Sequence, residues 1–221
     1  MKNEVTISKR FVIIYILIFF TAWTVNELFI FENLDRIVNN GILAQFIKEA
    51  IIKNLIWTLP AIILIVRYKN EVKIKLKYMF YIKINLLKYL PLFIFFTLYI
   101  LVRSYFVNKG LYISNDFGID KLIIVLFVGL TEEIVFRGWL LNILYREEKK
   151  ILSYLINSLL FLAIHFPIWI SKGDFFNNFT NLSFVGVIFL NLIFSYIFIK
   201  NKNLVLPILL HMYWDLLIFM F

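Results

Sequence analysis

The sequence contains no cysteine among its 221 residues, so it can form neither a disulfide framework nor a thiolate metal site, and it has no cysteine nucleophile. Charge is also scarce, since Asp, Glu, Lys and Arg together make up only 17% of the chain. Only four prolines are present, and no Pro-rich or Ser-rich linker, internal repeat or low-complexity tract divides the chain. We therefore expect a single domain over residues 1–221.

Hydrophobic residues, in contrast, make up 62% of the sequence, and 25 residues are phenylalanine. This balance, with its positive mean hydropathy, is that of an integral membrane protein. The net charge of +9 does not indicate nucleic-acid binding, because the basic residues lie in short segments between apolar runs, where membrane topology places them. The abundance of Lys, Ile, Asn and Phe is typical of an AT-rich prokaryotic genome, so we expect a multi-pass protein of a prokaryotic cell membrane.

Seven apolar runs are candidates to cross the bilayer as helices, because a hydrocarbon core of about 30 Å requires roughly 17 to 25 residues. The runs cover residues 11–31, 51–66, 90–102, 122–145, 151–170, 183–199 and 204–221. The second and third are short, and we expect them to continue into segments 44–53 and 84–89. Fifteen Lys and Arg residues fall on one side of this bundle and seven on the other, which favours a cytoplasmic amino terminus. The sequence thus predicts an all-α polytopic bundle of about seven transmembrane helices.

Two adjacent carboxylates, Glu132 and Glu133, lie in the middle of the fourth run. An ionisable group at this depth costs at least a few kcal/mol, so its presence indicates a partner, a water-filled cavity or chemistry. Backbone in lipid must be helical, so Glu133 and Arg137 are i,i+4 neighbours whose side chains can pair. Glu132 lies about 100° around the helix, without that partner.

Both histidines of the chain also lie within predicted spans. Phe161 and His165 are one helical turn apart on one face, and Pro167 is expected to bend or loosen the helix just beyond His165. His211 and Asp215 share a face in the seventh run. A rise of ~1.5 Å per residue places His165 at nearly the depth of the two glutamates, whereas for His211 helix tilt or a later cytoplasmic end of the span must absorb up to about 10 Å.

Each of these features also has a structural interpretation. The carboxylate and arginine can be a buried ion pair, and a histidine within a span can hydrogen-bond a neighbouring helix, as we expect of Asn157 and Asn191. The combination of carboxylates, an arginine and two histidines on three spans at compatible depths favours a functional site.

Three elements carry a resemblance to a known family. They are E-E-x-x-x-R at residues 132–137, F-x-x-x-H at 161–165 and H-x-x-x-D at 211–215. In order and in placement on successive late helices they resemble the motifs of the CPBP (Abi) family, which groups type II CAAX prenyl endopeptidases with bacteriocin-processing and bacteriocin-immunity proteins. The resemblance covers roughly residues 121–221. It implies an intramembrane endopeptidase whose active site lies in a cavity between the helices.

The resemblance also implies a role for each motif. Glu132 is expected to be the general base that activates the attacking water, assisted by His165. Glu133 and Arg137 are expected to form the supporting pair that orients these groups. His211 is expected to stabilise the oxyanion of the tetrahedral intermediate.

Asp215 departs from the family pattern, because many members have asparagine at this position. An amide can donate a hydrogen bond to an oxyanion, whereas a carboxylate repels it, so Asp215 is expected to orient His211, to hold it protonated or to bind a metal. Zinc bound by Glu132, His165 and His211 is the alternative to a glutamic-type protease. The strong H-E-x-x-H signature is absent, and we expect a site without a cofactor.

The expected substrate is a peptide or a membrane protein, because CAAX prenylation is not expected in a prokaryote. A bacteriocin or pheromone precursor fits this class, and the protein would then act in maturation or in self-immunity. Two other functions stay open. One is a catalytically inactive membrane scaffold or regulator, and the other is a proton-coupled transporter, against which the lack of an internal repeat counts.

Overall fold

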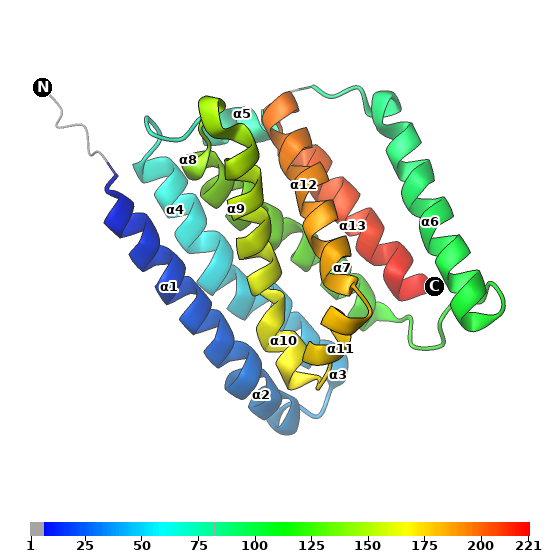
Figure 1. Ribbon diagram of the computed structural model, residues 1–221. Helices are drawn as coiled ribbons and strands as arrows, with labels where there is room; N and C mark the ends of the chain where they lie inside the picture. Colours follow the sequence, from blue (N-terminus) through cyan, green and yellow to red (C-terminus); the bar gives the residue numbers. More distant parts are fainter. Residues whose placement is uncertain (1–6, 82) are drawn as a thin grey trace, which may run out of the picture.

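A computed structural model describes residues 7–81 and 83–221 of the chain (Figure 1). Helices account for 82% of the structure, and the described residues contain no strand. Helices are what a bilayer requires, because each backbone group must find its hydrogen-bond partner within its own segment. The predicted all-α class is confirmed.

The helices follow one another with short connections. The first half of the chain forms α1 (Lys9–Val25), η1 (Asn26–Ile30), α2 (Phe31–Ile37), α3 (Gly41–Phe46), η2 (Ile47–Ile52), η3 (Asn54–Thr58), α4 (Leu59–Arg67), α5 (Leu76–Tyr81), η4 (Leu86–Tyr89) and α6 (Leu90–Asn108). The second half forms α7 (Ile119–Glu133), η5 (Ile134–Leu141), α8 (Asn142–Leu144), η6 (Glu147–Lys149), α9 (Lys150–Ala163), α10 (His165–Ser171), α11 (Phe175–Thr180), α12 (Ser183–Asn201) and α13 (Val205–Met220). Of the η segments, η1, η2, η3 and η5 are π-helical and η4 and η6 are 3₁₀.

Several of these elements join into longer continuous helices, which make the chain a multi-pass membrane protein. Five are long and apolar enough to cross a bilayer, and they cover Lys9–Ile37, Gly41–Arg67, Leu86–Asn108, Glu147–Ser171 and Ser183–Asn201. The second and third begin well before their apolar runs, as expected. The predicted count of seven is not confirmed, because runs 122–145 and 204–221 are helical but are not among the five.

The π-helical segment η5 is the central element of the bundle, since all eight of its residues are buried. Aromatic rings surround it. Trp57 lies against Phe19 and Trp23 with ring centroids 5.0 and 4.7 Å apart, and Phe136 of η5 faces Trp57 at 6.3 Å. Such edge-to-face contacts supply packing energy that does not depend on exclusion from water. The motif that begins at Glu132 is therefore held at the centre of the protein.

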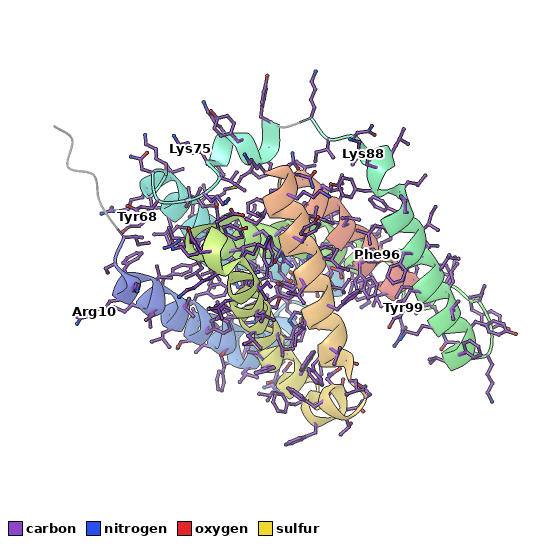
Figure 2. All side chains as sticks on the ribbon, turned by 45° about the horizontal axis from the view of Figure 1, so that its top comes forward. Arg10, Tyr68, Lys75, Lys88, Phe96 and Tyr99 are labelled. Carbon is purple, nitrogen blue, oxygen red and sulfur yellow. The ribbon has the colours of Figure 1, made fainter. Side chains whose placement is uncertain are left out.

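Helix α6 packs on the rest of the bundle through one face (Figure 2). Phe96 is fully buried against Trp214 of α13, with 5.1 Å between ring centroids, whereas Tyr99 is 49% exposed. On another side of the bundle, the Asn157 amide of α9 donates to Asn191 and Ser195 of α12 at 3.1 and 3.2 Å. These bonds confirm the expected packing role of the two asparagines.

Helices α7 and α13 approach closely at Gly129. A Cβ atom at this position would lie 2.7 Å from the Met212 Cγ atom and 3.2 Å from the Met212 backbone nitrogen, so only glycine fits the crossing without displacement. This close approach puts Glu133, one turn further along α7, next to His211 of α13.

The helix that carries His165 is interrupted, but not where the sequence suggested. The break falls at Ile164, between α9 and α10, and not beyond His165. The reason is that a proline disturbs the carbonyl four residues before it, which for Pro167 is that of Ala163. The Trp23 indole nitrogen donates to the Ile164 carbonyl at 2.9 Å and ties the break to α1. His165 thus directly follows an irregular residue within the long helix Glu147–Ser171.

Candidate active site

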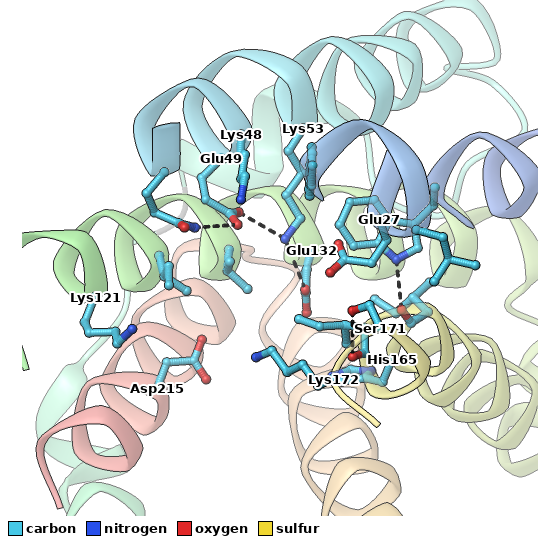
Figure 3. Close-up of a pocket in the computed structure, with 18 of the residues that line it drawn as sticks. Glu27, Lys48, Glu49, Lys53, Lys121, Glu132, His165, Ser171, Lys172 and Asp215 are labelled. Atoms are coloured by element: carbon cyan, nitrogen blue, oxygen red, sulfur yellow. Dashed lines mark hydrogen bonds and ion pairs between the residues drawn. The ribbon is translucent and has the colours of Figure 1, made fainter. Parts of the chain in front are cut away.

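A cavity of about 630 Å³ lies between α1, α2, η2, α7, α10 and α13 (Figure 3). Four of the six predicted site residues line it: Glu132, His165, His211 and Asp215. The other two, Glu133 and Arg137, have fully buried side chains. The structure therefore brings the three motifs together around one polar space.

The layer behind the cavity is built on Glu133. Its Oε1 atom lies 2.8 Å from Arg137 Nη1 and 2.8 Å from His211 Nδ1, so one carboxylate holds both partners. The Arg137 guanidinium lies over the rings of Phe161 and Phe194, 4.7 and 5.5 Å from their centroids. Its nitrogen atoms have no aligned hydrogen-bond acceptor among the described residues, so the ion pair and the two ring faces stabilise its charge. The predicted Glu133–Arg137 pair is confirmed.

His211 has a defined orientation. Glu133 is paired with an arginine and accepts only, so His211 Nδ1 is the donor of their hydrogen bond. The other nitrogen, Nε2, faces the cavity and lies 3.8 Å from Glu132 Oε2 and 3.6 Å from Asp215 Oδ2. Asp215 is thus close to His211, as its i,i+4 spacing predicts, and three carboxylates lie near the imidazole, one at Nδ1 and two at Nε2.

His165 presents its Nε2 atom for chemistry. Its Nδ1 lies 2.8 Å from the Phe161 carbonyl, an acceptor, so the proton is on Nδ1 and Nε2 keeps its lone pair. Figure 3 shows His165 and Glu132 in the same cavity. Within the described part of the chain no hydrogen bond joins the two side chains, and the cavity between them is where a water or a substrate group would lie.

The structure adds a site residue that the sequence analysis missed, Lys53. The residue is only 4% exposed, and its Nζ lies 3.1 Å from Glu49 Oε2 and 3.8 Å from Glu132 Oε1. The rings of Trp23 and Trp57 lie about it, with centroids 5.1 and 5.0 Å from Nζ. The available signal was the i,i+4 pair of Glu49 and Lys53 at the start of the second span.

Glu27 is a second cavity residue that the motifs do not include. It lies in η1 and lines the cavity with Glu49 and Lys53. Its acidic side chain within an apolar run was the available signal, but no partner at helical spacing accompanies it. Glu132 consequently faces a space whose other walls carry both acidic and basic groups.

The three ligands of the zinc alternative, Glu132, His165 and His211, are not gathered around one point in this structure. Among the described residues, no three His, Asp or Glu side chains gather as ligands of one ion. His211 Nε2 and Glu132 Oε2 lie 3.8 Å apart, whereas no ion pair or hydrogen bond among the described residues joins His165 to either side chain. Zinc needs ligand atoms at about 2.0–2.2 Å from one centre. We therefore derive no step through a metal.

The fold and site define a multi-pass membrane protein with a polar, partly charged cavity enclosed by helices. Residues 115–217 match a family model described as type II CAAX prenyl endopeptidase, Rce1-like. This segment, which includes α7 to α12, most of α13 and all three motifs, belongs to that family, the CPBP or Abi family, as the motifs predicted. Comparison with curated proteins and with solved structures found no match. The family supports a function of the intramembrane endopeptidase type.

Proposed function

We propose that this protein is an intramembrane endopeptidase in which Glu132 activates a water molecule for attack on a peptide bond. The observation that carries the proposal is the position of Glu132. Its carboxylate lines the cavity beside Lys53, while Glu133, its neighbour in the chain, contacts Arg137 and His211 behind the cavity wall. One carboxylate is thus committed to structure and its neighbour is directed toward the reaction space.

In the proposed first step, water lies between Glu132 and His165. Glu132 accepts a proton from the water, and the oxygen attacks the carbonyl carbon of the peptide bond. His165 assists through Nε2, which can accept a hydrogen bond from the same water because Nδ1 is already bonded to the Phe161 carbonyl. The proton then passes from Glu132 to the leaving amine nitrogen, and the bond between carbon and nitrogen breaks.

His211 stabilises the negative oxygen of the intermediate in this mechanism. With Nδ1 donating to Glu133, protonation makes Nε2 a donor that points into the cavity. The carboxylates of Glu132, Glu133 and Asp215 around the ring favour its positive form. We assign Asp215 to this electrostatic role and to orienting His211, from which it lies 3.6 Å away, rather than to direct contact with the oxyanion.

The proposed substrates are peptides or membrane proteins at the cell membrane, with maturation of a peptide precursor or self-immunity as the biological role. The test uses purified protein in detergent with peptides from secreted precursors of the host, in water enriched in ¹⁸O. We expect cleavage that persists with a chelator and places ¹⁸O in the new carboxyl terminus. Chelator-sensitive cleavage restored by zinc would contradict the metal-free mechanism. No cleavage by folded wild type would support the scaffold instead.

Lys53 gives a separate prediction, because it is a cation beside the proposed base. At 3.8 Å and an effective dielectric constant of about 20, opposite charges attract by about 4 kcal/mol before desolvation is counted. In Lys53→Met we expect kcat at neutral pH to fall about 10- to 100-fold, which corresponds to about 1.4 to 2.8 kcal/mol. KM should change little, since Lys53 acts through Glu132.

The pH profile separates this role from a merely structural one. Without the nearby cation a smaller fraction of Glu132 is ionised at neutral pH, so the acidic limb of kcat should move to higher pH and activity should recover there. Lys53→Arg keeps the cation, so the acidic limb of its kcat profile should lie at the same pH as that of wild type. The control is Lys77→Met, an exposed lysine of α5. A uniform loss of activity at every pH would show that Lys53 only supports the fold.

A further inference from the structure

The active-site cavity opens at one end of the bundle. Its deep residues are nearly inaccessible, with Glu132 and His211 only 6% and 7% exposed. The lining residues near the ends of α2 and α10 are exposed instead: Glu32, Asp35, Ser171 and Lys172. Figure 1 shows α2, α3, α10 and α11 together at this end, which we call the mouth end.

The opposite side of the site is closed. Helix segment η5 continues from Glu133 toward the other end of the bundle, and every one of its residues is buried. Trp139, Leu140 and Leu141 have no exposed surface at all. A substrate therefore reaches Glu132 from the mouth end and not through η5.

Basic residues lie mainly at the closed end, where Figure 2 shows Arg10, Lys75 and Lys88. Fourteen described Lys and Arg residues lie there, at positions 9, 10, 67, 69, 73, 75, 77, 83, 88, 146, 149, 150, 200 and 202. Six lie toward the mouth end, at positions 36, 48, 103, 109, 121 and 172, and Lys2 lies outside the described residues. The basic ends of membrane helices are retained in the cytoplasm. The mouth of the cavity, at the opposite end of the bundle, then faces away from the cytoplasm.

We propose that the active-site cavity opens on the extracytoplasmic face and takes as substrate a peptide segment presented from that side, as part of a secreted or membrane-anchored protein. The nature of the substrate rests on the proposed endopeptidase function. The face on which the cavity opens rests only on the fold and on the distribution of the basic residues. A protein modified and kept in the cytoplasm cannot reach Glu132 in this orientation. The mixed acidic and basic lining of the mouth fits a hydrated peptide segment.

The absence of cysteine makes the sidedness directly measurable. Asn39→Cys lies in the exposed loop between α2 and α3 at the mouth end, and Lys69→Cys lies in the exposed loop after α4 at the closed end. In sealed spheroplasts, a membrane-impermeant maleimide should label Asn39→Cys as fully as after permeabilisation, and should label Lys69→Cys only after permeabilisation. The reverse pattern would overturn the proposal. Labelling of both variants in permeabilised cells controls for expression and access.

A second arm tests the cavity and the substrate side. Ser171→Cys, at the mouth, should be labelled in sealed spheroplasts, as Asn39→Cys is. The peptide that wild type cleaves in detergent should be cleaved when added outside right-side-out vesicles and spared outside inverted ones. Cleavage only by inverted vesicles would overturn the proposal. If no preparation cleaves peptide, the endopeptidase function fails, while the labelling still decides the sidedness.

Discussion

Replacing Glu132 by glutamine is expected to lower kcat for peptide cleavage by about 10²- to 10⁴-fold, the range that a general base contributes. Glutamine has nearly the same shape but cannot accept the proton of the attacking water. Because the Glu132 carboxylate lies 3.8 Å from both Lys53 Nζ and His211 Nε2, the amide can occupy the same space without a steric clash. Steady-state cleavage of one peptide by wild type and variant measures the loss.

The comparison needs a folded variant and a matched control. Thermal unfolding in detergent should show that Glu132→Gln is nearly as stable as wild type, since Lys53 keeps its ion pair with Glu49 and His211 keeps its contact with Glu133. Glu148→Gln, at an exposed position of η6, should cleave as wild type does. Cleavage retained in Glu132→Gln would exclude Glu132 as the base. A cellular phenotype that survives the loss of cleavage would identify a scaffold.

Replacing Arg137 by methionine is expected to be the most damaging change to the fold. The guanidinium is completely buried and forms the ion pair with Glu133. Removing one partner of a buried pair leaves the other charge uncompensated and typically costs about 3 to 5 kcal/mol. His211 still contacts Glu133 through Nδ1, but it also lies close to Glu132 and Asp215, so it cannot replace the lost cation.

The loss can be measured as the free energy of unfolding in mixed micelles of detergent and denaturing surfactant. Arg103→Met is the matched control, because Arg103 is exposed on α6 and should change stability little. Arg137→Lys keeps the charge but not the planar group between Phe161 and Phe194, so an intermediate stability is expected. Wild-type stability of Arg137→Met would show that Glu133 does not need its arginine.

Local spacing explains why much of the site could be predicted. Residues four apart on a helix share a face, so the pairing of Glu133 with Arg137 and the closeness of His211 to Asp215 follow from their positions in the chain. Long apolar runs in turn require helices, since no other open structure satisfies the backbone in lipid. A side-chain amide within a span needs a hydrogen-bond partner on a neighbouring helix, so the packing role of the asparagines of α9 and α12 could also be predicted.

Lys53 shows where this kind of inference ends. It precedes Glu132 by many residues, and nothing in the spacing of either residue indicates that they meet. Their approach depends on how η2 and α7 pack, and so does the place of Glu27 on the cavity wall. The position of the break before His165 could have been predicted, because it follows from the carbonyl that Pro167 disturbs.

The amino-acid order was thus sufficient for the helical class, the paired residues within each motif and the family resemblance, because periodicity and apolar length act over one helix at a time. Packing between helices set the rest. It placed Glu133 against His211, introduced Lys53 beside Glu132 and left the cavity open at one end. These contacts join residues far apart in the chain, and their geometry depends on side-chain fit at crossings such as Gly129 and Met212, which no single segment encodes.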